Sequence, residues 1–228
     1  MSEMSSRLIR WGGRAAVVGG ILFAAVFALI NLLIYGLEVL RGAFLESHAF
    51  AHMLDAPMFL LLAAGALALY LRQKEHFGRL GRAGFYLTFG GFAFAAIGGL
   101  AIIVVGLSVG EEATLGVLDV LAHPLSMLLY SFGSVLFGIA TFQASVLPRA
   151  GALLLAIGAP LWFFGPAFFS SLIDGSEDWI FALPAMAPAA LFGGGWALLG
   201  YALRSEIGER SAHPRPYWRI ERKGTGDV

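Results

Sequence analysis

Six apolar runs, each long enough to cross a lipid bilayer, constrain this chain more than any other feature of its sequence. They cover about 15–38, 53–71, 83–108, 119–143, 150–172 and 179–203. A membrane-spanning helix needs about 20 predominantly apolar residues. The 228 residues are 58% hydrophobic and only 13% charged, whereas about a quarter of a soluble domain is charged. The sequence therefore predicts an all-α, polytopic membrane protein with six transmembrane helices.

The distribution of positive charge predicts the orientation of these helices. If the N-terminus is inside, the inner segments are 1–14, 72–82, 144–149 and 204–228, and they hold 14 of the 15 Lys and Arg residues, with Arg41 as the exception. Because cytoplasmic loops carry an excess of Lys and Arg, we expect both termini on the cytoplasmic side. Residues 1–208 are expected to form the transmembrane domain, and 209–228 a cytoplasmic tail with basic and aromatic side chains.

A threefold internal repeat organises the six runs. An arginine begins each odd-numbered run and a proline interrupts each even-numbered one, and both sets recur at nearly equal intervals. These residues are Arg14, Arg82 and Arg149, and Pro57, Pro124 and Pro188. A fixed period of this kind indicates repeated supersecondary units. We expect three parallel helical hairpins at about 12–72, 80–143 and 147–204. Parallel repeats occur in transporters, but also in proteins with no transport role.

The composition excludes several classes of function. The chain has no cysteine, which excludes disulfides, thiolate catalysis and cysteine-ligated clusters. Its formal net charge is zero, so no nucleic-acid partner is expected. The expected partners are the lipid bilayer and either another membrane protein or a second copy of the chain.

Polar side chains form stripes on three of the predicted helices. On the fourth helix, the stripe falls within an arc of roughly 80° and consists of Asp119, His123, Ser126, Tyr130, Ser134 and Thr141. Lipid would leave these groups without hydrogen-bond partners, so the stripe is predicted to face protein or a watery cavity. At i, i+4, i+7 spacing, the first helix carries Asn31, Tyr35 and Glu38, and the second carries His48, His52 and Asp55.

The repeat brings two of these stripes to the same depth. Aligning the prolines of the second and fourth helices places His52 level with Asp119, and Asp55 within one residue of the level of His123. If these two helices are neighbours, two His–carboxylate pairs stack near the outer membrane surface. The third repeat has Leu183, Met186 and Ala187 at this depth, so such a site would break the pseudo-symmetry.

Three functions fit this cluster, and a structural role competes with them. His48, His52 and His123 with a carboxylate could bind zinc, although the spacing is not that of an H-E-x-x-H motif. His52 and His123 could instead be axial ligands of a haem, or the pairs could relay protons or gate a solute. In the structural alternative, they are satisfied contacts between helices at a wet membrane surface.

Two short motifs give a resemblance. The segment Val146-Leu147-Pro148-Arg149-Ala150-Gly151 and the Arg-Trp-Gly-Gly opening at 10–13 resemble small six-helix membrane proteins of high-GC bacteria, to which no activity is attached. The resemblance implies a bacterial cytoplasmic membrane and no catalytic residues. Our first expectation is a non-catalytic interaction protein or a small-solute or ion permease. The alternative is a metal- or haem-binding membrane protein, such as a hydrolase or redox protein.

Overall fold

The computed structural model describes residues 3–36, 48–109, 123–172 and 179–212. All of these residues are helical except for two short turns, at 74–78 and 145–148. The six helices are α1 (Glu3–Gly36), α3 (His48–Gln73), α4 (Arg79–Val109), α6 (His123–Ala144), α7 (Arg149–Leu172) and α8 (Trp179–Ala212). Each overlaps one of the six predicted runs, which confirms the prediction of an all-α chain with six long helices.

Five of these helices are long and apolar enough to cross a membrane. The spans are Arg7–Phe27, Leu54–Gln73, Arg79–Val104, His123–Ala144 and Met186–Ser205. The sixth helix, α7, has a shorter apolar stretch, Arg149–Gly165, within the residues whose side chains are described. The chain therefore has the architecture of a multi-pass membrane protein, and the crossing by α7 stays a prediction.

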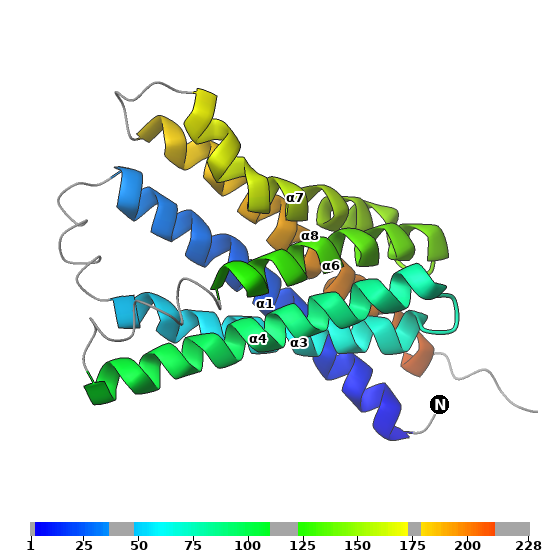
Figure 1. The fold of residues 1–228 in the computed structure, drawn as a ribbon. Helices are drawn as coiled ribbons and strands as arrows, with labels where there is room; N and C mark the ends of the chain where they lie inside the picture. Colours follow the sequence, from blue (N-terminus) through cyan, green and yellow to red (C-terminus); the bar gives the residue numbers. More distant parts are fainter. Residues whose placement is uncertain (1–2, 37–47, 110–122, 173–178, 213–228) are drawn as a thin grey trace, which may run out of the picture.

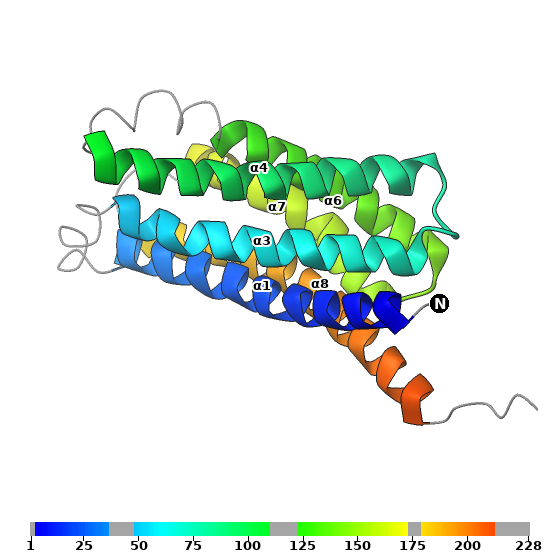
Figure 2. The same ribbon diagram turned by 90° about the horizontal axis from the view of Figure 1, so that it is seen from below.

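The helices form a closed ring in the order of the sequence. Each helix packs against its neighbours in the chain, and α8 closes the ring through an extensive contact with α1. Figures 1 and 2 show the resulting bundle, in which the helices run alternately up and down. One end, which we call the proximal end, holds the start of α1, the two short turns and the end of α8 (Figure 2). The opposite end is called the distal end.

The second and fourth helices of the sequence, α3 and α6, are not neighbours in this ring. Each packs along α4, and no extensive contact joins α3 to α6 within the described residues. The predicted His–carboxylate pairs require these two helices to be direct neighbours. Their backbones do not meet this condition. Across the centre of the ring, the side chains of Phe59 on α3 and Tyr130 on α6 meet.

Glycines allow the helices of the ring to approach closely. Gly20 of α1 and Gly193 of α8 face each other so tightly that a Cβ on either would overlap the other helix's backbone. Nearer the proximal end, a Cβ at Gly13 would lie 3.1 Å from the Gly200 carbonyl oxygen. Small residues at helix contacts permit this packing in lipid, where van der Waals contact replaces the hydrophobic effect as the driving force.

The turn between α6 and α7 is fixed by local hydrogen bonds. Ser145 has a φ of 52°, the left-handed conformation that commonly follows the last residue of a helix. Its N–H donates to the Thr141 carbonyl at 3.2 Å, and its hydroxyl accepts a bond from the Arg149 guanidinium at 3.2 Å. Arg149 also lies 5.4 Å from the ring of Phe142. Arg149 therefore ties the end of α6 to the start of α7.

Candidate functional site

Of the five residues predicted to bind metal, Asp55 and His123 have described side chains. Asp55 is buried on α3, whereas His123, the first residue of α6, is half-buried. Both side chains interact with other groups. The other three, His48, His52 and Asp119, lie outside the described side chains. No three His, Asp or Glu side chains gather within the described part of the chain, so the five-residue cluster stays a prediction.

The polar stripe of α6 lies inside the bundle wherever its side chains are described. Ser126, Tyr130, Ser134 and Thr141 are all buried. The Ser126 hydroxyl donates to the carbonyl of His123 at 2.8 Å, whereas the hydroxyls of Ser134 and Thr141 have no partner. This burial agrees with the orientation expected from the sequence, in which the stripe faces protein or a watery cavity. The stripe on the first helix, Asn31, Tyr35 and Glu38, lies outside the described side chains.

The centre of the ring is filled by one aromatic side chain from each helix. Neighbouring ring centroids are 4.8–6.4 Å apart, within the range in which aromatic pairs attract. We call this set the aromatic layer; its members are Phe23, Phe59, Phe92, Tyr130, Trp162 and Phe192. All are buried. A hydrogen bond of 3.0 Å from the Trp162 indole N–H to the Tyr130 oxygen satisfies the polar atoms of both.

Aromatic packing continues from this layer to the proximal end. Trp196 of α8 lies 5.4 Å from Phe92 and stacks on Phe137 of α6 at 6.0 Å. Phe77, in the turn between α3 and α4, meets Phe137 edge-on at 5.5 Å and is itself buried. The axis of the ring is therefore occupied by side chains from its middle to its proximal end.

Two cavities of the bundle lie away from this axis. One, of about 210 Å³, opens between α6 and α7. The other, of about 190 Å³, lies beside the turn between α3 and α4. The residues that line these two cavities include neither Asp55 nor a member of the aromatic layer. Neither of these cavities therefore connects the two ends of the bundle.

Asp55 is a buried acidic residue on the distal side of the aromatic layer. It is one helical turn before Phe59 on α3 and only 7% exposed. A carboxylate at this depth is costly unless it has partners. Together with the Ser126 hydroxyl, it places polar groups on the distal side of the layer, while the proximal side carries Trp196 and Phe137 beside the buried hydroxyls of Thr88 and Ser134.

Sequence patterns did not reveal the aromatic layer. With 19 phenylalanines in the chain, no single ring stands out. A weak signal was present, because Phe23, Phe92 and Trp162 follow the arginines that precede the three odd-numbered apolar runs at intervals that agree to within about one helical turn.

Comparisons with protein families, with curated proteins and with solved structures gave no match to this chain. Its function is therefore inferred from the geometry of the bundle.

Proposed function

We propose that this chain is a non-catalytic multi-pass membrane protein that acts by binding, and that it does not conduct solutes along its axis. The observation that carries this proposal is the aromatic layer, to which all six helices contribute. A hydrated ion or polar solute on the axis would have to displace several close-packed rings, because protein interiors hold few voids larger than a water molecule. Hydrophobic constrictions of this kind also exclude water.

The outer surface of the bundle supports an interaction role. On α8, Ala187 and Ala190 are exposed, and a Cβ at Gly194 would meet nothing within 4 Å. Residues this small let a partner helix approach closely in lipid. A second copy of the chain, or another membrane protein, is the partner that such a face fits.

A flux measurement tests the closed axis. The protein is reconstituted in liposomes loaded with potassium ions or a small polar solute, with gramicidin-treated liposomes as the positive control for ion efflux. We expect efflux at the rate of protein-free liposomes. Saturable efflux several-fold above that rate would support a permease instead, in which the aromatic layer opens during each cycle.

A cross-linking measurement tests the interaction. Because the chain has no cysteine, a Gly194→Cys variant introduces a single thiol on the exposed face of α8. We expect oxidation in the membrane to link two chains at this position, and not at Ile97→Cys, an exposed position on α4. Equal yields at the two positions would mean random collision, and no link at either would exclude pairing of two copies through this face.

The finer architecture that we propose is three hairpins with both termini in the cytoplasm of a bacterial cell. At the proximal end lie the start of α1, the two short turns and the end of α8 (Figure 2). These parts carry the basic residues of the predicted inner segments whose side chains are described: Arg7, Arg10, Arg14, Arg72, Lys74, Arg79, Arg82, Arg149 and Arg204. Since positive charge favours the cytoplasmic side, this end is assigned to the cytoplasm. The resemblance to membrane proteins of high-GC bacteria supports the cytoplasmic membrane as the location.

Equivalent glycine contacts support the repeat. Within the three hairpins, backbones approach at Gly19–Leu62, Gly91–Tyr130 and Gly158–Phe192. The second and third of these glycines are as far apart in the sequence as the arginines that begin their hairpins. The first and second glycines, however, are separated by more than the corresponding arginines, and the difference is about one helical turn. We infer that the first hairpin has the same packing, shifted by that one turn.

The second candidate function is a metal or haem site at the distal end. It is favoured by one observation, the burial of Asp55 one helical turn before Phe59, whose ring meets Tyr130 of α6. Imidazole and carboxylate groups suit zinc, and His52 and His123 are the haem ligands in the other version of this proposal. Such a site would supply Lewis-acid or redox chemistry, and the chain would then be a candidate enzyme.

Elemental analysis of the purified protein distinguishes the two candidates. A metal site predicts zinc or iron near one atom per chain, lost in Asp55→Asn and in the His52→Ala/His123→Ala double variant. Glu75→Gln, an exposed carboxylate in the proximal turn, serves as the control and should leave the metal content unchanged. No metal in any of these proteins would sink the second candidate without affecting the first.

A further inference from the structure

The larger of the two cavities lies between α6 and α7 and opens to the surface that faces lipid. It measures about 210 Å³ and is lined by Ser131, Phe132, Val135, Pro160, Phe163 and Phe164. Phe132 and Phe164 are 53% and 54% exposed, so a molecule dissolved in the bilayer can enter between them. Pro160 lacks an N–H and therefore breaks the hydrogen-bond ladder of α7 at this point.

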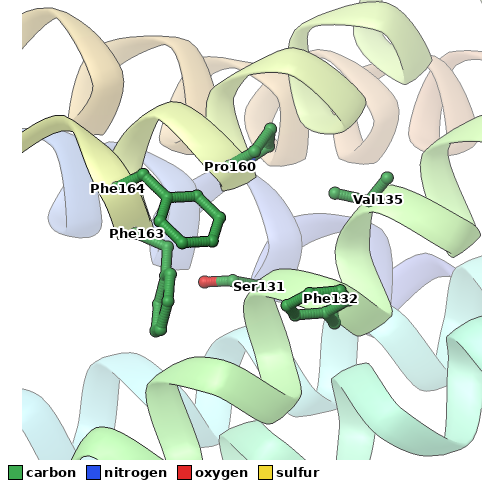
Figure 3. Close-up of a pocket in the computed structure, with 6 residues that line it drawn as sticks. All are labelled: Ser131, Phe132, Val135, Pro160, Phe163 and Phe164. Atoms are coloured by element: carbon green, nitrogen blue, oxygen red, sulfur yellow. The ribbon is translucent and has the colours of Figure 1, made fainter. Parts of the chain in front are cut away.

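Ser131 is the polar residue among those that line this cavity, and its oxygen is covered, so the exposed lining is apolar. Figure 3 shows its hydroxyl pointing from α6 across the gap toward Phe163 of α7. The residue is 2% exposed, and its oxygen has no hydrogen-bond partner. A helical serine in a membrane commonly donates to the carbonyl four residues earlier, as the hydroxyl of Ser108 does to Val104. The Ser131 hydroxyl is instead left as an unused donor.

The size and depth of the cavity restrict its occupant. A cavity of about 150 Å³ binds benzene, so 210 Å³ accommodates one substituted ring but not a larger ring system. Ser131 is eight residues from the start of α6, or about 12 Å along the helix. The hydroxyl therefore lies within the hydrocarbon region of a bilayer whose core is about 30 Å thick. Phospholipid ester groups, which stay at the interface, do not reach it.

We propose that this cavity binds the head group of a membrane-dissolved quinone, a single ring that carries carbonyl oxygens and an apolar tail. The Ser131 hydroxyl donates a hydrogen bond to one carbonyl, and the rings of Phe163 and Phe164 pack against the quinone. The tail leaves between Phe132 and Phe164 into the lipid. Since the Ser131 oxygen is covered in the present conformation, binding requires a rotamer change of Ser131 or Phe163. This site is independent of the distal polar site.

A titration with a decyl-substituted benzoquinone tests the proposal. The protein is placed in lipid nanodiscs, and saturable quenching of tryptophan fluorescence reports binding, because Trp162 adjoins the lining residue Phe163. Decylbenzene, with the same tail and a ring but no carbonyl, competes in parallel. We expect it to displace the quinone only weakly.

Three variants sharpen the test. Ser131→Ala removes one oxygen and should weaken quinone binding about fivefold, the value of a typical hydrogen bond. Val135→Phe fills the cavity and should abolish saturable binding. Ser108→Ala removes a hydroxyl that already has a partner and should leave binding unchanged. The proposal is overturned if quenching does not saturate, if Ser131→Ala binds as the wild type does, or if decylbenzene competes as well as the quinone.

Discussion

The indole N–H of Trp162 on α7 donates a hydrogen bond of 3.0 Å to the phenol oxygen of Tyr130 on α6. Tyr130 is 1% exposed and Trp162 is 7% exposed, so water does not compete for either group. The bond lies in the aromatic layer, and it joins α6 to α7. It is thus a directional contact at the centre of the bundle.

We expect the two partners of this bond to be strongly coupled. Trp162→Phe leaves the Tyr130 phenol without its donor, and Tyr130→Phe leaves the indole N–H unsatisfied, each at a cost of about 1–3 kcal/mol. The double variant has no orphaned polar atom and should lose much less than the sum. Thermal unfolding in detergent, followed by size exclusion, measures the three variants against the wild type. Additive losses would show that the bond contributes no coupling.

Adjacent glycines on α8 should respond in opposite directions to alanine. A Cβ at Gly193 overlaps the backbone of α1 at Gly20, whereas one at Gly194 meets nothing within 4 Å. Gly193→Ala should therefore destabilise the bundle by several kcal/mol, because overpacking displaces backbone. Gly194→Ala should be neutral or stabilise by up to about 1 kcal/mol through helix propensity.

The same comparison is available on α4 at Gly91, which packs on Tyr130, and Gly90, which faces open space. Thermal unfolding of the two alanine variants gives an independent result. Equal stability of the variants within each pair would contradict the close packing at Gly193 and Gly91.

Phe77 should hold the proximal end of the bundle closed. It is 5% exposed and contacts both Tyr70 and Phe137. Phe77→Ala leaves a void between the α3–α4 turn and α6, with an expected cost of about 3 kcal/mol. The neighbouring residue His76 is exposed, so His76→Ala should change stability by less than about 0.5 kcal/mol. If the two variants unfold at the same temperature, Phe77 has no closing role.

Single cysteines should report the orientation of the chain. Glu75 lies in the turn at the proximal end, and Glu112 belongs to the segment between the third and fourth predicted helices. A membrane-impermeant maleimide added to intact cells is expected to label Glu112→Cys and not Glu75→Cys. Permeabilised cells should show labelling at both positions, which controls for reactivity. The reverse pattern would place both termini outside.

By itself, the sequence determined the six helices, because their lengths and apolar composition depend only on local properties of the chain. It also predicted that polar residues of the fourth helix turn inward, since Ser126 and Ser134 share one face at helical spacing and lipid offers them no partners. The candidate site was predictable only as a set of residue types, His and carboxylate, at similar depths.

Only the tertiary structure decided which side chains meet. The ring order separates α3 from α6 and places α4 between them, which no periodicity within one helix can indicate. It also decided that one aromatic residue from each helix fills the axis, and that the hydroxyl of Ser131 lacks a partner while that of Ser108 has one. The physical reason is that a helix's own sequence determines which of its faces is buried. Which of these faces pack together depends on where small residues such as Gly20 and Gly193 let two backbones touch.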